Sequence, residues 1–221
     1  MTGVARASVD AVIDAARTVE LKRGDPVWCP SDKADTVYWV RSGVVRVERG
    51  ADDVHPLILR FHGRRDLFGV AALYSGRSRG TTALAHEECV VFGVPVGQIE
   101  RLVHDEGRLG LRLSDLLIER QHRLEGRLAG LIHQPISDRL LALFVDVARD
   151  FGIRDGERVI VDLRLTHKQM AAMVGATRET VSLALQRLKR GGWVTTEERR
   201  FILLKPREMG VKVKPRRGRR L

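Results

Sequence analysis

The sequence has only two cysteines, Cys29 and Cys89, among its 221 residues. Two thiols are too few for a disulfide framework, a four-cysteine iron–sulfur cluster or a four-cysteine zinc site. The sequence also lacks an apolar run of the roughly 20 residues that a transmembrane helix needs. Its first residues, MTGVARASVD, lack the basic stretch and apolar core of a secretory signal. We therefore expect a cytoplasmic protein with no membrane partner.

A catalytic constellation is missing as well. The sequence has no Ser/His/Asp set, paired carboxylates or metal-spaced ligands in an order that suits a cleft, so we do not expect an enzyme. His86 and Cys89 lie close together, but no further spaced ligand accompanies them. We interpret this pair as a surface turn near a strand rather than a metal site. Cys29 is expected to be a buried thiol at a strand edge.

Acidic residues are scarce only in the C-terminal part of the chain. The net charge is +11, from 39 Lys and Arg against 28 Asp and Glu. Residues 158–221 hold 17 basic and five acidic residues, whereas residues 1–157 hold 22 and 23. Because neutralised phosphates release their counterions, one basic region on a neutral body indicates a polyanionic partner. A membrane surface attracts the same charge, and a basic tail such as 205–221 can serve solubility alone.

Two hydrophobic periodicities divide the chain. Residues 18–95 contain short apolar runs separated by Gly, Asp and Ser turn signals, which is typical of an all-β sandwich or barrel. The clearest runs are 37–40, 44–47, 57–61 and 90–94. From about residue 105, leucines recur at near-heptad spacing and predict a long helix with an apolar seam. This seam comprises Leu113, Leu117, Leu124, Leu128 and Leu131. We favour a dimer helix over a helix packed only on its own β domain.

Shorter elements flank these two regions. A short helix is expected at 9–17, before the strands. After a break at Pro135, another helix is expected from residue 136 to about 150, followed by a turn region at 152–156 and a strand at 159–163.

Residues 165–194, LTHKQMAAMVGATRETVSLALQRLKRGGWV, have the pattern of a helix-turn-helix. Thr166 and Gln169 form a capping box that begins the first helix, and Thr177 caps the second. Gly175 suits a turn with positive φ, and Val181 suits a buried position. The small Ala171 allows the helices to approach, and Gly191 with Gly192 ends the second helix. Residues 193–204 then fit a two-stranded β-wing.

An ordinary αα-hairpin would share some of these features, but here the caps, the turn glycine, the wing and the basic charge coincide. The second helix, residues 177–190, would enter the major groove. Arg178 can donate to guanine or a phosphate, Glu179 can accept from cytosine, and Ser182 can reach either a base or a phosphate. The predicted DNA-binding residues are Thr166, His167, Lys168, Thr177, Arg178, Glu179, Ser182, Leu183, Gln186, Arg187 and Lys189.

The segment ATRETVSLALQRL, with nearly all of residues 15–205, resembles the bacterial cyclic-AMP receptor protein and fumarate-nitrate reductase regulator (Crp/Fnr) family of transcription regulators. The resemblance implies an α+β fold. It comprises a cyclic-nucleotide-binding-like β jelly roll over 1–104, a dimerisation helix over 105–134, and a winged helix-turn-helix with a basic tail over 135–221. It also implies a homodimer on near-palindromic double-stranded DNA, with RNA polymerase and a small-molecule effector as further partners. The alternative is a sensor or adaptor whose basic tail binds RNA, a membrane or an acidic protein.

The sequence departs from the family at two places. The arginine that usually follows the small residue at Ser182 is here Leu183, which suits contact with a thymine methyl. In the effector pocket, a glutamate that holds the ribose is replaced by Val70, and a serine beside Arg79 is replaced by Gly80. The residues at the positions that correspond to the family's effector pocket are Gly69, Val70, Ala71, Arg79, Gly80, Thr81, Leu124 and Glu125. Each lost buried partner costs about 1–3 kcal/mol, so we expect no tight cyclic-AMP binding in the usual pose and a different or absent effector.

Overall fold

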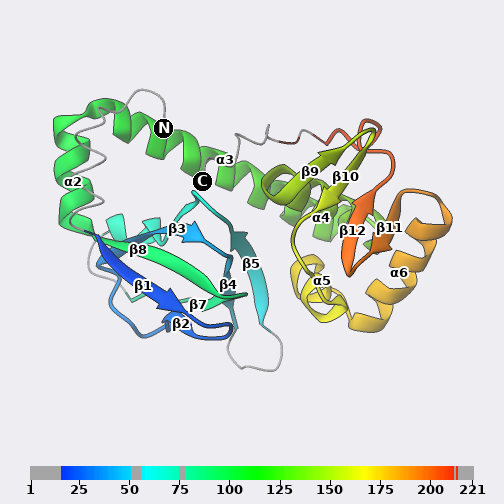
Figure 1. Ribbon diagram of the computed structural model, residues 1–221, viewed down its shortest axis with the longest axis horizontal. Coiled ribbons are helices and arrows are strands. Elements are labelled where there is room, and N and C mark those ends of the chain that lie inside the picture. The colour runs from blue at the N-terminus through cyan, green and yellow to red at the C-terminus, as the bar shows by residue number, and fades with distance from the viewer. Residues whose placement is uncertain (1–15, 51–55, 75–77, 212, 214–221) are drawn as a thin grey trace. The chain divides into compact units, whose positions relative to one another are not determined.

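The computed structural model describes residues 16–50, 56–74, 78–211 and 213 (Figure 1). The chain forms two compact units, Met1–His122 and Arg123–Leu221, and the division falls inside a single long helix. Each unit is described below by itself. The basic tail beyond residue 213 and most of the helix expected at 9–17 lie outside the described residues.

The first unit is built on two four-stranded sheets whose pairings are all antiparallel. One sheet has the order β1 (Arg17–Leu21), β8 (Cys89–Pro95), β3 (Thr36–Ser42), β6 (Leu67–Phe68). The other has the order β2 (Pro26–Trp28), β7 (Thr82–Ala85), β4 (Val45–Arg49), β5 (Leu57–His62). Sequence neighbours are mostly in different sheets, as in a jelly roll, and the fold class expected from the sequence is confirmed.

The core of this unit lies between the two sheets, because alternate side chains of each strand point to the same face. Val40 and Val91 come from the first sheet, Val45 and Ala83 from the second, and all four are fully buried in one cluster. A second cluster around Val37 is covered by the short 3-10 helix η1 (Val70–Leu73) and by the helix that follows β8. The strands therefore hold η1, part of the predicted effector pocket, against the core.

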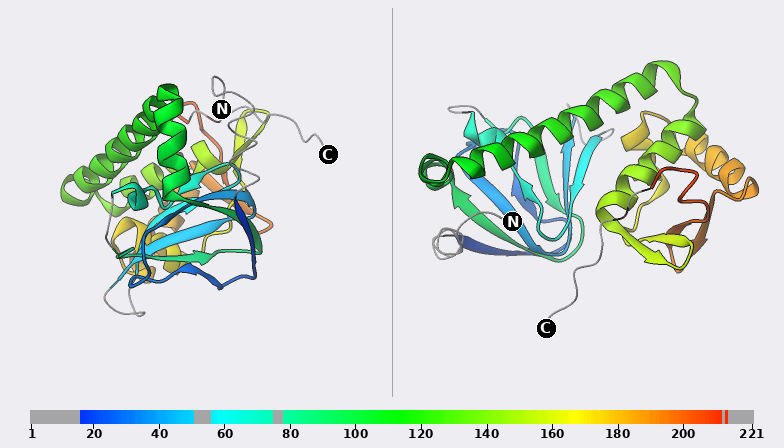
Figure 2. Two further views of the ribbon diagram at one scale, coloured as in Figure 1. Left: turned by 90° about the vertical axis from the view of Figure 1, so that its left-hand side faces the viewer. Right: turned by 90° about the horizontal axis from the view of Figure 1, so that it is seen from above.

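Two helices follow β8. The first, α2 (Val96–Asp105), was missed by the sequence analysis, although Val96, Ile99 and Val103 have the spacing of one helix face and pack on the core. The chain turns a corner at Glu106 (Figure 1), and α3 (Gly107–His133) then continues as one unbroken helix (Figure 2). Leu113 packs on the core of its own unit. The other members of the predicted seam are exposed in the single chain: Leu117, Leu124, Leu128 and Leu131.

The second unit has helices packed on one four-stranded sheet. After α4 (Ile136–Phe151) come β9 (Gly152–Asp155), β10 (Arg158–Val161), α5 (His167–Val174), α6 (Arg178–Arg190), β11 (Val194–Glu197) and β12 (Arg200–Leu203). The antiparallel sheet has the order β11-β12-β10-β9. Phe144 of α4 is buried with its ring 5.0 Å from that of Phe201, so helix and sheet share one core. No helix of the described residues is long and apolar enough to cross a membrane.

Four local predictions were wrong. Arg17, placed in the leading helix, begins strand β1. The turn region at 152–156 is a hairpin, because residues 152–155 pair with β10. Cys29 is exposed, since β2 ends one residue earlier. His86 and Cys89 are buried rather than on a surface turn, because the His86 ring packs edge-on against Phe61 and Cys89 lies in the core.

Gly43 is a position where the fold requires glycine, and Gly24 is a matched control. Both have a positive φ, but a Cβ at Gly43 would lie 2.2 Å from the carbonyl oxygen of Glu88, whereas a Cβ at Gly24 would meet open space. Gly24→Ala should therefore lower the free energy of unfolding by about 1–2 kcal/mol, and Gly43→Ala by about 1–3 kcal/mol more. Urea denaturation measures both losses, and equal losses would contradict this account of the turn.

Candidate nucleic-acid interface

The first helix of the predicted pair begins at a complete capping box. Thr166 Oγ1 accepts a hydrogen bond from the Gln169 backbone N–H at 3.2 Å, and Gln169 Oε1 accepts one from the Thr166 backbone N–H at 2.9 Å. The predicted start of α5 is therefore confirmed. His167 and Lys168 stand in the first turn, where unpaired backbone N–H groups and the helix dipole favour an anion.

The turn between the two helices depends on Gly175. Its φ of 64° lies in the left-handed region, which costs other residues about 1–2 kcal/mol. A Cβ there would also come within 2.9 Å of Leu131 Cδ2. Beside it, Arg139 of α4 donates from Nη1 to the Val174 carbonyl at 2.8 Å, which satisfies one of the free carbonyls that end α5. The sequence predicts the glycine turn, but no local pattern around Arg139 predicts this bond.

The second helix has one buried and one exposed face. Thr177 caps it by accepting from the Thr180 backbone N–H at 3.2 Å, as predicted. Val181 and Leu185 are buried where α6 packs against α4 and α5. The opposite face exposes Arg178, Glu179, Thr180, Leu183, Gln186, Arg187, Lys189 and Arg190. Thr180 was missed, although its place three residues after a threonine cap marks it as part of the first turn.

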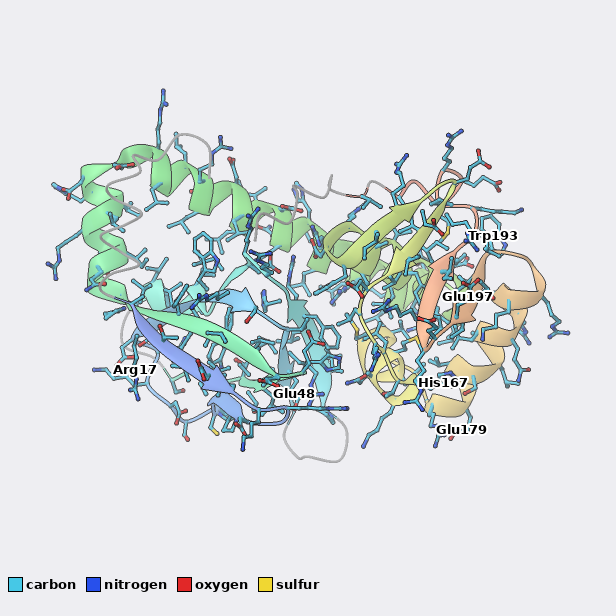
Figure 3. All side chains as sticks on the ribbon, viewed as in Figure 1. Arg17, Glu48, His167, Glu179, Trp193 and Glu197 are labelled. Atoms are coloured by element: carbon cyan, nitrogen blue, oxygen red, sulfur yellow. The ribbon has the colours of Figure 1, made fainter. Side chains whose placement is uncertain are left out.

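Apart from Arg178 in the first turn, the charges at the two ends of α6 follow its dipole. Glu179 lies in the first turn, and Arg187, Lys189 and Arg190 lie in the last. The first turn of α5 lies against the second turn of α6, because His167 Nδ1 lies 2.8 Å from Ser182 Oγ. Figure 3 labels His167 and Glu179 where the two helices begin. The structure thus brings Thr166, His167 and Lys168 together with the leading end of α6.

The predicted β-wing is also present. Strands β11 and β12 pair in register from Val194 with Leu203 to Glu197 with Arg200. Glu198 and Arg199 make the connection with φ values of 48° and 64°, as in the two-residue turns that match strand twist. Arg158 of β10 lies 3.5 Å from Glu197, so an ion pair ties the wing to the neighbouring hairpin.

Arg79, one of the predicted effector-pocket residues, donates hydrogen bonds to backbone carbonyls of its own unit. Arg79 Nη2 donates to the Thr36 carbonyl at 2.7 Å, and Nη1 donates to the Gly69 carbonyl at 3.4 Å. Its guanidinium lies 4.5 Å from the ring centre of Trp28 and 5.4 Å from that of Tyr38. Burial lowers the pKa of Arg79 and raises that of Tyr38. Arg79 therefore connects the backbone at Thr36 and Gly69 with the rings of Trp28 and Tyr38.

Aromatic rings from both sheets fill the space beside Arg79. The rings of Trp28, Tyr38 and Phe68 lie 5.4 Å apart in each pairing, and His62 stacks on Phe68 at 5.2 Å. The indole N–H of Trp28 donates to Thr81 Oγ1 at 3.3 Å. Trp28 is only 4% exposed, and the sequence analysis did not single it out. Its three-residue strand is too short to show a pattern.

The remaining pocket positions are less enclosed. Val70 and Ala71 begin η1 after Gly69, whose φ is 72°, and Gly80 is exposed. Leu124 and Glu125 belong to the second unit, and their part in an effector pocket stays a prediction. No group of three or more metal-ligating side chains occurs among residues with described positions. Burial raises the pKa of Cys89 to about 11, so that this thiol stays protonated at neutral pH.

Two family models match the chain. One is described as a cyclic nucleotide-binding domain and matches residues 18–106; the other is described as a Crp-like helix-turn-helix domain and matches residues 136–209. The first covers the two β-sheets and α2, and the second covers α4 to β12. The long helix α3 lies between the two matched ranges.

Curated relatives align over most of the chain. The transcriptional regulator SdrP of Thermus thermophilus is 31% identical over 189 residues, which are 85% of this chain and 89% of the relative. The CRP-like cAMP-activated global transcriptional regulator of Mycobacterium tuberculosis is 26% identical over 91% of this chain and 90% of its own. Neither relative is described as an enzyme.

Solved structures share the fold. FixK2 from Bradyrhizobium japonicum has a TM-score of 0.76 at 20% identity, covering 90% of this chain and 98% of its own. A CRP/FNR-family transcriptional regulator from Thermus thermophilus has a TM-score of 0.68 at 28% identity, covering 88% and 96%.

Substitution of Arg79 tests whether its contacts stabilise the first unit. Arg79→Ala should lower the free energy of unfolding by about 2–3 kcal/mol, because it removes a charged hydrogen bond to Thr36 and the stacking on Trp28. Arg41→Ala is the control, since that exposed guanidinium only lies 5.6 Å over Phe92 and should cost less than about 1 kcal/mol. Chemical denaturation checks both. An unchanged stability in Arg79→Ala would mean that Arg79 is held free for a ligand.

Proposed function

Because this chain belongs to the Crp/Fnr family of DNA-binding transcription regulators, we propose that it acts as a homodimer on near-palindromic DNA with α6 in the major groove. The observation that carries this proposal is the leading end of α6, where Arg178, Glu179 and Thr180 are all exposed on a helix whose opposite face is buried. A major groove about 12 Å wide admits one α-helix, and the first turns of that helix then reach the base edges.

The proposed contacts divide into two kinds. Arg178 and Glu179 stand in the first turn of α6, where a guanidinium can donate to guanine O6 and N7 and a carboxylate can accept from cytosine N4. Leu183 is 58% exposed, which is unusual for leucine and suits contact with a thymine methyl. Lys168, Arg187 and Lys189 would bind phosphates and set the position of the protein on the duplex.

The exposed leucines of α3 support a homodimer. Leu117, Leu124, Leu128 and Leu131 repeat along the helix at near-heptad spacing and are each about half exposed in the single chain. A row of exposed leucines on one helix is costly in water and marks an interface, and a second copy of α3 offers the same row. A twofold dimer would place two recognition helices about 34–36 Å apart, one turn of DNA.

We propose further that the effector is not cyclic AMP in the usual pose. The Val70 side chain cannot accept a hydrogen bond from a ribose. Arg79 donates to the carbonyls of Thr36 and Gly69, and its guanidinium stacks on the ring of Trp28. Either another molecule acts on this unit or the protein binds DNA without one. RNA polymerase is the further partner that family membership suggests.

Two substitutions test the division between base contacts and phosphate contacts. Lys168→Ala should weaken binding to selected and scrambled duplexes equally and lower the salt slope of the dimer by about two, one for each protomer. Glu179→Ala should relax the preference at one base pair in each half-site, worth about 1–3 kcal/mol per base pair, and leave the salt slope unchanged. Salt titrations with both duplexes measure this. Identical losses on the two duplexes for both variants would refute the division, and absence of any duplex preference in the wild type would favour the adaptor alternative.

The dimer is tested by charge on the leucine row. Leu128→Glu should dissociate the protein to monomers at micromolar concentration and weaken binding to a two-half-site duplex, because a carboxylate cannot be buried unpaired between two helices. Leu111→Glu, on the same helix but outside the row and 68% exposed, should leave the dimer intact. Sedimentation equilibrium distinguishes the two. A Leu128→Glu protein that stays dimeric would contradict the role of this row.

A further inference from the structure

The junction between α5 and α6 contains a serine with two close polar neighbours. Ser182 Oγ lies 2.9 Å from the carbonyl oxygen of Arg178 and 2.8 Å from Nδ1 of His167. A hydroxyl has one hydrogen, and a carbonyl can only accept. The hydrogen therefore points to the Arg178 carbonyl, which is the common back-bond of serine within a helix.

This assignment fixes the proton on His167. Because the hydroxyl hydrogen of Ser182 is used, the 2.8 Å contact needs a hydrogen on Nδ1 of His167. A neutral imidazole carries one N–H only, so Nε2 then holds a lone pair. The opposite tautomer would leave two oxygens, Ser182 Oγ and the Arg178 carbonyl, 2.9 Å apart with no hydrogen between them.

The charges around His167 keep it neutral in the free protein. Partial burial lowers its pKa below 6.5, and the positive charges of Arg178 and Lys189, both on α6, lower it further. Lys168 adds a neighbouring positive charge on α5 itself. The charges of Arg178 and Lys189 that act on His167 are both positive, and a row of phosphates brought to this surface would oppose them.

Resting on the proposed function, we propose that His167 is a proton-linked positioning residue: it holds Ser182 through Nδ1–H and takes up a proton on Nε2 when DNA binds. The proton comes from solvent, and the imidazolium gains a second N–H that can donate toward a phosphate. Ser182 keeps one lone pair for the groove. It therefore accepts from the amino group of cytosine or adenine and cannot donate to a phosphate, which narrows its predicted role.

The sign of the pH dependence follows from linkage. DNA binding raises the pKa of His167, so binding takes up a proton at pH values between the free-state pKa and the bound-state pKa. In that window the affinity rises as the pH falls, by up to tenfold per pH unit for each α6 that engages. Above the bound-state pKa the affinity no longer depends on His167.

The experiment measures duplex affinity of the full chain by fluorescence anisotropy from pH 5.5 to 8 at constant ionic strength. His167→Gln keeps a side-chain donor but cannot be charged, so the pH dependence of its duplex affinity should be mostly lost. His104→Gln removes an imidazole that is 89% exposed in the first unit and should keep the wild-type slope. A His167→Gln slope equal to that of the wild type overturns the inference.

A second measurement is independent of DNA. Nitrogen NMR of the free chain at pH 8 reports which ring nitrogen of His167 carries hydrogen, and we expect Nδ1, with the signal changed in Ser182→Ala. Hydrogen on Nε2 overturns the inference. Failure of every variant to bind any duplex would overturn the proposed function together with this inference, whereas binding with an unchanged pH slope would overturn this inference alone.

Discussion

The apolar contact of α6 with α4 and α5 is the constraint on which the interface depends. Val181, Ala184, Leu185 and Leu188 bury one face of α6, and this burial alone fixes which side chains face outward. Burial of each large side chain contributes about 1.5–3 kcal/mol, far more than the surface charges that it orients. Caps at Thr166 and Thr177 and the left-handed turn at Gly175 then set where each helix begins and how the two cross. The packing of the buried face of α6 therefore decides which polar side chains its exposed face presents.

In the first unit an internal cation has an equivalent organising role. Arg79 connects the Thr36 and Gly69 carbonyls and stacks on Trp28, so that its guanidinium stabilises the domain itself. The neighbouring rings come from both sheets and are packed against each other. This packing is the reason that we propose an effector other than cyclic AMP in the usual pose, or none.

Patterns with a local cause were predictable from the sequence, and contacts between distant residues were not. The capping box, the turn glycine, the wing and the short strands β3 to β5 each depend on residues a few positions apart, and all are present. The bond from Arg139 to Val174, the contact of His167 with Ser182 and the enclosure of Arg79 join residues 15 to 43 positions apart. Cys29 was misplaced because whether a strand end is buried depends on what packs above it. Helix α2 was missed although its apolar spacing was visible.

The central claim is that the leading end of α6 lies in the major groove of two adjacent half-sites. Methylation interference on a selected duplex tests it most directly, because methylation of guanine N7 blocks the major groove and methylation of adenine N3 blocks the minor groove. We predict interference at guanine N7 in two blocks centred about 10 base pairs apart, with no comparable effect at adenine N3 within those blocks. Interference only at adenine N3, or a single block at guanine N7, would contradict the claim.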